Sequence, residues 1–382
     1  LMVLATVLKS AGYKVEIFDM AILELGYETL GPYIEKVNPK VIGIQNRSTY
    51  SYPIVQKTAR VIKEIDPSVP VIVGGTHVSY NPEQSLKESE AIDYIFIGET
   101  EITLPRFLKA YLAGKRDISE VEGIVFRDKD GSVRRTAHFL PLEDLSMLPL
   151  PDLDLVPIDR YVERQERYII HLSRGCQHNC PYCTSEFVKN NLRFRPAEHV
   201  VDEIKMAYQR GFRKFYFFDN MFTVRRDMVL ETCKMIVEAD LNISWPCMTN
   251  VGKVDDELLT WMYKAGCDLI AYGIETMTEK ALIDIGKHRQ AKKIQETFDM
   301  TRKHGIRPLA FVIFGLPNTE LTDEFRTIKF ITEIQPDAVR SFCFKPFPGT
   351  HYYDNAEEFG ILDLNTDMSR WSILDEPTHH TT

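Results

Sequence analysis

The 382-residue sequence predicts an α/β protein of two domains, in which a doubly wound parallel sheet precedes an open barrel of six βα units. Short β-branched runs alternate with amphipathic segments from residue 14 to about 112, and again from residue 169 to about 345. Between these series, residues 137–168 carry four prolines, which indicates a linker. With 44% hydrophobic residues, a chain of this length can bury more than one core.

The first series opens with an amphipathic helix over residues 1–12, for which Gly12 is the stop signal. Buried parallel strands read as continuous β-branched runs, and such runs alternate here with helical patterns. The expected strands are 14–18, 41–44, 69–73 and 94–97, and the expected helices are 30–37, 54–65, 82–88 and 103–112. Asp130-Gly131 predicts a hairpin over 123–136. We place the first domain at 1–136 and expect its first strand to be missing, since the chain begins within a helix.

The second series predicts a partial, TIM-like (β/α)6 barrel, because six strands are separated by helical segments. We place this domain at residues 169–355, after a linker at 137–168, and interpret 356–382 as the start of a truncated C-terminal region. The strands are expected at 169–173, 214–218, 243–247, 269–273, 309–314 and 339–344.

Charge and composition exclude several classes of protein. The formal net charge is −9 and no long basic block is present, which disfavours nucleic acid and anionic membranes as partners. Apolar runs such as 310–316 are too short to span a bilayer, and the first residues do not form a signal sequence. All seven cysteines lie beyond residue 175, a poor distribution for a secreted disulfide scaffold. We predict a cytoplasmic protein.

Cys176, Cys180 and Cys183 crowd into one segment directly after a predicted strand. Three thiolates from one loop can bind three irons of a four-iron cluster and leave the fourth iron open for a substrate or cofactor. The alternative is a structural zinc site that His178 or a distant His completes. A zinc finger usually places its second ligand pair a dozen or more residues later, and the other cysteines have no close Cys or His partner in sequence. We interpret these four as buried apolar residues: Cys233, Cys247, Cys267 and Cys343.

The Cys-x₃-Cys-x₂-Cys spacing, with an aromatic residue before the last Cys and at the first strand-to-helix loop of a barrel, resembles the radical S-adenosylmethionine (SAM) superfamily. Four further segments follow in the expected order over residues 169–355, namely 218–223, 273–275, 312–317 and 346–350. The resemblance implies that Cys176, Cys180 and Cys183 hold a [4Fe-4S] cluster whose open iron binds the amino and carboxylate groups of SAM. One electron then cleaves SAM to give a 5′-deoxyadenosyl radical.

The same resemblance implies contacts to SAM. Tyr182 would lie beside the adenine, and Glu275 would accept a hydrogen bond from the methionine ammonium. The other implied SAM contacts are Asn220, Asn250, Gly273 and Gly315. The alternative for Gly273 and Glu275 is a plain strand-to-helix turn, and Asn is common in such loops for turn reasons alone.

Paired glycines follow the predicted strand 69–73, at a sheet edge where backbone can approach a ligand closely. With the segments 45–49 and 96–101 and the radical SAM pattern downstream, residues 1–136 resemble the Rossmann-like cobalamin-binding domain of B12-dependent radical SAM proteins. The implied cobalamin contacts are Ser48, Thr49, Gly74, Gly75, His77, Gly98 and Glu99. A turn-capping or surface role is the alternative for His77. The Asp-x-His-x-x-Gly signature is absent, as it is from many members of this class, because Asp19 is followed by Ala21 and Glu24 at the His and Gly positions.

This resemblance implies a class B radical SAM methyltransferase that acts on an unactivated carbon of a small-molecule substrate. Methylcobalamin would donate the methyl group, a second SAM would remethylate the cobalamin, and a one-electron donor such as flavodoxin or ferredoxin would supply the electron. One alternative is an oxidative cyclase similar to anaerobic magnesium-protoporphyrin IX monomethyl ester cyclase. Another is a non-catalytic module that binds B12 or zinc. The sequence identifies no residue for acid-base catalysis.

Overall fold

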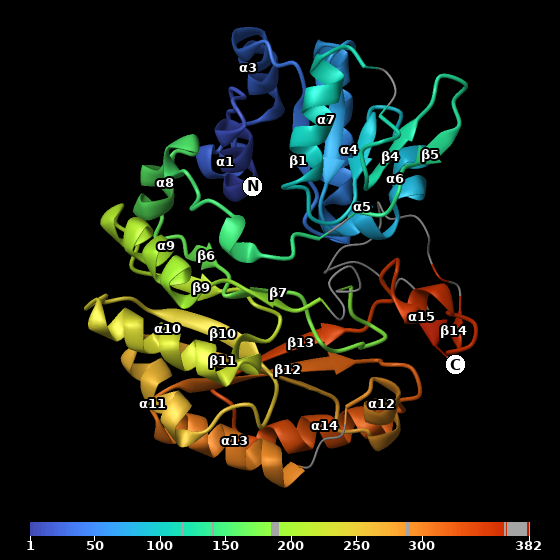
Figure 1. Cartoon of the computed structure of the whole chain (residues 1–382). Coiled ribbons are helices and arrows are strands. Elements are labelled where there is room, and N and C mark those ends of the chain that lie inside the picture. Colours follow the sequence, from blue (N-terminus) through green and yellow to red (C-terminus); the bar gives the residue numbers. More distant parts are fainter. Residues whose placement is uncertain are drawn as a thin grey trace.

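The computed structural model describes residues 1–115, 118–139, 141–184, 191–287, 291–362, 364 and 380–381. Figure 1 shows two αβ units, with the first (blue to teal) above the second (green to red). Each unit is built on its own sheet, which confirms the predicted α/β class. Within the described part of the chain, no helix is long and apolar enough to cross a membrane.

The first unit contains one five-stranded sheet in the order β1-β2-β3-β4-β5. Strands β1 (Ile42–Gln45), β2 (Val71–Gly74) and β3 (Tyr94–Phe96) are parallel. Strands β4 (Ile124–Arg127) and β5 (Val133–Arg135) form the predicted hairpin at one edge. The helices of this unit are α1 (Met2–Ser10), α2 (Met20–Leu23), α3 (Leu30–Val37), α4 (Tyr52–Ile65), α5 (Thr76–Tyr80), α6 (Pro82–Glu88) and α7 (Thr103–Leu112).

Helices cover both faces of this sheet, as a doubly wound fold requires. Val71, Val73 and Ile95 point to one face, where they pack with buried residues of α3, α4 and α6. Ile72 and Phe96 point to the other face and pack with α1 and α7. Alternate residues of each strand are therefore buried on opposite sides, which explains why the strands are apolar throughout.

The predicted strand at 14–18 is wrong, since residues 13–19 form no strand. Phe18 instead stacks on Tyr33 of α3, with ring centroids 4.0 Å apart. The Asp19 carboxylate accepts hydrogen bonds from the backbone N–H groups of Ala21 and Ile22 and so caps α2. Packing against helices thus buries the apolar side chains of this segment without a strand partner.

The second unit contains six parallel strands in chain order, as predicted. They are β6 (Tyr168–Ile170), β9 (Phe215–Phe217), β10 (Trp245–Thr249), β11 (Cys267–Glu275), β12 (Arg307–Phe314) and β13 (Ala338–Cys343). A bridge between Lys214 and Ser244 joins the β6-β9 pair to the four-stranded sheet that begins with β10. The predicted open barrel is therefore confirmed.

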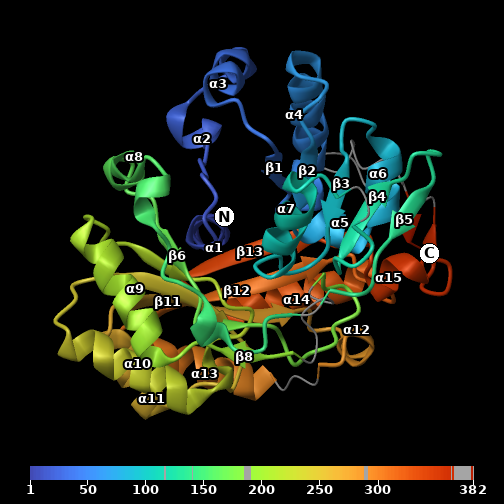
Figure 2. The ribbon, with the colours of Figure 1, turned by 45° about the horizontal axis from the view of Figure 1, so that its top comes forward.

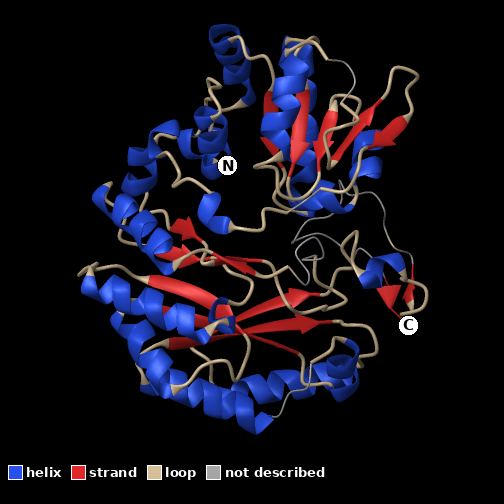
Figure 3. Cartoon of the chain, viewed as in Figure 1, coloured by secondary structure: helices blue, strands red, loops and turns tan. Residues whose placement is uncertain are grey.

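The longer helices of the second unit cover the outer face of its strands, on the side away from the first unit (Figure 3). The principal ones are α9 (Ala197–Gln209), α10 (Arg226–Glu238), α11 (Asp256–Lys264), α13 (Ala291–Lys303) and α14 (Leu321–Ile334). The shorter ones are α8 (Ile158–Glu163), α12 (Glu279–Asp284) and α15 (His351–Asp354), and β14 (Ile361–Leu362) pairs with β15 (His380–Thr381).

The first unit lies over the inner side of the barrel in both views of the ribbon (Figures 1 and 2). The loop after β13 contacts the loop after β1, where the rings of Phe347 and Tyr50 meet edge to face at 5.7 Å. A Cβ atom built on Gly349 would lie 2.6 Å from the ring of Tyr80 in α5. The carboxyl ends of strands from both sheets therefore meet at one place, where ligands bind in open α/β sheets.

Candidate functional site

The three predicted cysteine ligands lie in residues 175–184, which we call the cysteine loop. Its base is a short antiparallel pair, β7 (Ser173–Arg174) and β8 (Arg193–Phe194), which we call the neck. Cys176 is buried, Cys180 and Cys183 are half-buried, and none of the three is in a disulfide. Gly175 has φ +107°, and a Cβ atom there would lie 2.1 Å from the carbonyl oxygen of Asn191. The neck therefore requires glycine at this position.

A buried carboxylate anchors the start of the cysteine loop. Asp219, directly after β9, accepts hydrogen bonds from the backbone N–H groups of Leu172 (3.1 Å) and Ser173 (2.5 Å) and from the Ser173 hydroxyl (2.6 Å). Burial raises the pKa of Asp219 to about 6, although all three donors favour the ionised form. No sequence pattern marks Asp219 as a site residue, although it adjoins Asn220 in the segment 218–223.

Two of the predicted SAM contacts bind the cysteine loop itself. The side-chain amide of Asn220 donates to the carbonyl oxygen of Gly175 at 3.3 Å. The amide nitrogen of Asn250 lies 3.1 Å from Nε2 of His178. Both asparagines therefore shape the loop, and their contact with SAM stays a prediction.

The donor set fits an iron-sulfur cluster, because three thiols on one segment can each bind a different iron. His178, the candidate zinc ligand, lies beside Asn250.

Glu275 ends β11 and is nearly buried, with φ +67°. Its carboxylate accepts a hydrogen bond of 2.5 Å from Nζ of Lys287, which is also nearly buried. A Cβ atom on Gly273 would lie 2.4 Å from the Glu275 carboxylate, so glycine leaves room for this side chain. No spacing rule links Lys287 to Glu275, so the sequence does not predict this pair, and only the fold brings the two side chains together.

Lys287 also provides a positive charge beside the cysteine loop. Its ammonium lies 6.0 Å from the ring centroid of Tyr182, which is itself half-buried. Burial raises the pKa values of the Cys176 and Cys180 thiols, and the Lys287 charge opposes that rise. Lys287 therefore favours the thiolate forms that bind iron.

Gly315 turns the chain between β12 and α14, with φ +73°. Its N–H donates to the carboxylate of Glu324 at 2.8 Å. This hydrogen bond gives the glycine a local role, and its predicted contact with SAM remains a prediction.

In the first unit, the loop after β1 lies against α5. Thr49 Oγ1 and His77 Nδ1 are 3.1 Å apart, and the His77 ring lies 4.6 Å from that of Tyr52. Burial lowers the pKa of His77 to about 4, so its ring is neutral at pH 7. Nε2 of His77 and Oδ1 of Asn46 are buried without a hydrogen-bond partner. Unsatisfied buried polar atoms at the carboxyl edge of a sheet fit a bound ligand.

Two of the glycines predicted to contact cobalamin, Gly75 and Gly98, lie close to other parts of the protein. Gly75 has φ +123°, and a Cβ atom there would lie 2.1 Å from the carbonyl oxygen of Asn46, so its close approach is to the β1 loop. A Cβ atom on Gly98 would lie 2.5 Å from the ring of Phe139, whereas one on Gly74 would have its nearest neighbour at 3.7 Å. Ser48 forms a capping box with Ser51.

Glu99 binds Arg193 of the neck, with two contacts of 2.6 and 2.9 Å. Burial raises the pKa of Glu99, but the contacts with Arg193 and Arg174 outweigh burial and hold the pKa below its usual value. The structure thus gives this carboxylate a partner in the second unit, and its assignment to cobalamin stays a prediction.

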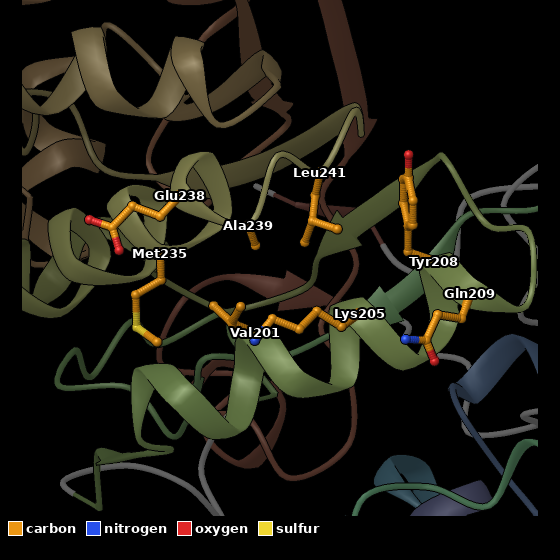
Figure 4. A pocket seen from close by; sticks show the side chains of 8 residues that line it. All are labelled: Val201, Lys205, Tyr208, Gln209, Met235, Glu238, Ala239 and Leu241. Atoms are coloured by element: carbon orange, nitrogen blue, oxygen red, sulfur yellow. The ribbon is translucent and has the colours of Figure 1, made fainter.

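A groove of about 510 Å³ lies elsewhere, between α9 and α10 on the outside of the barrel (Figure 4). Its lining residues are Val201, Lys205, Tyr208, Gln209, Met235, Glu238, Ala239 and Leu241. None of these is a predicted site residue.

Two family models match the chain: the B12 binding domain over residues 1–108 and the radical SAM superfamily over residues 170–331. An uncharacterized methyltransferase, PH0819, from Pyrococcus horikoshii is 26% identical over 367 residues, covering 95% of this chain and 79% of the relative. The anaerobic magnesium-protoporphyrin IX monomethyl ester cyclase of Rubrivivax gelatinosus is 27% identical over 381 residues, covering 95% and 67%.

Solved structures share the fold. The radical SAM methyltransferase TsrM from Kitasatospora setae, with cobalamin and a [4Fe-4S] cluster bound, superposes with a TM-score of 0.80 at 20% identity, covering 94% of this chain and 71% of that one. The cobalamin-dependent enzyme OxsB, with aqua-cobalamin and SAM bound, gives a TM-score of 0.75 at 20% identity and covers 94% and 52%.

The two domain matches lie in the predicted order and agree with the two observed sheets. They confirm the predicted cofactors, which are cobalamin for the first domain and a [4Fe-4S] cluster with SAM for the second. They also argue against the alternative of a non-catalytic B12- or zinc-binding module, because the second domain is that of a radical SAM enzyme. The chain therefore belongs to the radical SAM proteins in which a B12 binding domain precedes the radical SAM domain.

Proposed function

We propose that this protein is a cobalamin-dependent radical SAM methyltransferase that acts on an unactivated carbon of a small molecule. The observation that carries the proposal is the meeting of both domains at the carboxyl ends of their strands, where Phe347 and Tyr50 are in contact. Relatives named as methyltransferases, including the cytidylyl-2-hydroxyethylphosphonate methyltransferase of Streptomyces wedmorensis at 25% identity, support it.

In this proposal Cys176, Cys180 and Cys183 hold the cluster, while Tyr182, Asn220, Asn250, Gly273, Glu275 and Gly315 surround SAM. When bound, the cluster and SAM would supply a 5′-deoxyadenosyl radical, and cobalamin would supply a methyl group. Asp219 and Asn220 hold the cysteine loop in place, and the first domain, which lies over the inner side of the barrel, would exclude water from the reaction. The electron would come from a small one-electron donor such as flavodoxin or ferredoxin.

Glu275 and Lys287 form a pair of opposite charges that complements an amino acid. The methionine end of SAM carries an ammonium and a carboxylate, so Glu275 can accept from the first while Lys287 donates to the second. Because both side chains are nearly buried, water would screen these contacts only weakly.

Glu275→Gln is expected to weaken SAM binding by about 1.5 to 3 kcal/mol, the scale of a hydrogen bond to a charged group. Neither residue is a cluster ligand in this proposal, so the visible spectrum of the cluster should be unchanged. Anaerobic titration with SAM measures the effect, and Glu279→Gln, on the exposed first turn of α12, is the matched control. Equal SAM affinity in Glu275→Gln and the unmodified protein would rule out this role.

For cobalamin, we propose contacts from Ser48, Thr49, Gly74, Gly75, His77 and Gly98, and from the backbone of Glu99, whose carboxylate binds Arg193. Gly75→Val is expected to displace the β1 loop, because its side chain would collide with Asn46, and so to lower cobalamin occupancy while iron is retained. The Gly74→Ala control adds a methyl group where the nearest atom is 3.7 Å away and should keep cobalamin. Bound cobalamin is measured by its visible absorbance. Full occupancy in Gly75→Val would place the cobalamin elsewhere.

The second candidate function is an oxidative cyclase, which the Rubrivivax gelatinosus relative favours. The two candidates share hydrogen abstraction and differ in the fate of SAM. Incubation with SAM carrying a deuterated methyl group tests the choice by mass spectrometry. Both reactions form 5′-deoxyadenosine, because the deoxyadenosyl radical takes up the substrate hydrogen. A methyltransferase also forms S-adenosylhomocysteine and a product that gains the label, whereas a cyclase forms neither.

A further inference from the structure

Two arginines face each other across the neck of the cysteine loop. In the β7-β8 pair, Arg174 lies directly opposite Arg193. Like charges at opposed positions of an antiparallel pair destabilise the pairing. The Arg193 side chain is 7% exposed and that of Arg174 is 25% exposed, so water screens their repulsion poorly. The neck therefore needs negative charge from another part of the chain.

That negative charge comes from the first domain. Glu101 accepts a hydrogen bond of 2.8 Å from Arg174, and Glu99 lies 3.5 Å from the same guanidinium. Glu99 also accepts two hydrogen bonds, of 2.6 and 2.9 Å, from Arg193. The Glu99 and Glu101 side chains are 15% and 12% exposed. The four side chains thus form an alternating cluster with no net charge between the two domains.

The fold explains how the carboxylates reach the neck. Both follow β3, where Gly98 turns the chain with φ +70°. The segment between the domains contributes two further hydrogen bonds. The backbone N–H of Leu142 donates to Glu99 at 3.3 Å, and the carbonyl oxygen of Leu142 accepts from Arg193 at 2.5 Å. Glu99 and Glu101 therefore join the neck to the first domain through side-chain hydrogen bonds, and the backbone of Leu142 binds both sides of this contact.

We propose that Glu99 and Glu101 are positioning residues for the iron-sulfur site. By neutralising Arg174 and Arg193, the first domain closes the neck and fixes the loop that carries the cysteines. This inference rests on the proposed function, because it takes the cysteine loop as the cluster site. It follows that the cluster is held firmly only while the two domains are docked.

The test measures how fast iron leaves the anaerobically reconstituted 382-residue protein in the presence of a chelator, by loss of visible absorbance. Glu101→Gln leaves the opposed arginines with one carboxylate, so we expect iron release about tenfold faster. The matched control is Glu122→Gln, which removes a carboxylate paired with Arg106 within the first domain and should leave the rate unchanged. Thermal melting of the apoprotein verifies that each variant folds.

A rescue experiment separates charge from packing. In Glu101→Gln/Arg174→Gln, one of the two opposed positive charges is removed together with its carboxylate, so release should return close to the rate of the unmodified protein. The spectrum of the reduced cluster in electron paramagnetic resonance should shift in Glu101→Gln and recover in the double variant.

Equal release rates in Glu101→Gln and the unmodified protein would overturn the inference while leaving the proposed function intact. Release in the double variant as fast as in Glu101→Gln would also overturn it, because Glu101 would then act by filling space. An unmodified protein that takes up no iron and sulfide would instead refute the proposed function, and this inference with it.

Discussion

Cys176→Ala, Cys180→Ala and Cys183→Ala are each expected to abolish reductive cleavage of SAM. In the proposed site every thiolate binds a separate iron, and the cysteine loop offers no substitute sulfur ligand among its described residues. The measurement is 5′-deoxyadenosine formed by the anaerobically reconstituted, reduced protein, together with iron content. The expected loss is complete within detection.

Cys233→Ala and Cys343→Ala are the controls. Cys233 is fully buried within the barrel core, as predicted, whereas the predicted burial of Cys343 is wrong, since it is exposed on β13. Neither lies in the cysteine loop. Both variants should keep the cluster, with a cost in stability of about 1 kcal/mol for the buried one. Full 5′-deoxyadenosine formation by any of the three loop variants would refute the cluster assignment.

Asp219→Ala is expected to destabilise the barrel by about 3 kcal/mol or more and to release the cluster. The change leaves two backbone N–H groups and the Ser173 hydroxyl buried without their acceptor. Urea unfolding followed by circular dichroism measures the first effect, and iron content measures the second.

Asp219→Asn is expected to have an intermediate effect. Its amide oxygen can still accept from Ser173, but its amide nitrogen would face the N–H of Leu172. The control is Asp227→Ala, because Asp227 is an exposed carboxylate paired with Arg225. If Asp219→Ala kept both its unfolding midpoint and its iron, the carboxylate would not be the anchor of the cysteine loop.

Local signals predicted most of the fold. The helices at 30–37, 82–88 and 103–112 match α3, α6 and α7 at both ends. In α3 and α7 an apolar stripe is followed by Asn38 or Gly114 as a stop signal, and in α6 Pro82 marks the start. The alternation at 14–18 predicts a strand that does not form, because apolar side chains such as Phe18 can pack against a helix as well as within a sheet.

The candidate site could be predicted only where its residues are close in sequence. The spacing of Cys176, Cys180 and Cys183 identified the loop directly. Lys287 binds Glu275, 12 positions away in the sequence. Asp219 binds Leu172 and Ser173, 47 and 46 positions away. No local sequence pattern marks either contact. Glu99 was assigned to a cofactor because it follows a strand end, whereas its carboxylate binds Arg193, 94 positions along the chain.

The partners of the cysteine loop also determine when during synthesis the loop can become ordered. Glu99 and Glu101 leave the ribosome before the cysteines, but Asn250, which contacts His178, lies 72 positions after it. The backbone N–H that binds the carbonyl oxygen of Pro181 belongs to Tyr352, later still. A nascent chain therefore exposes all three thiols until nearly the whole barrel has been translated. Because an N-terminal domain generally folds first during synthesis, the cluster is expected to enter a chain whose B12 binding domain is already folded.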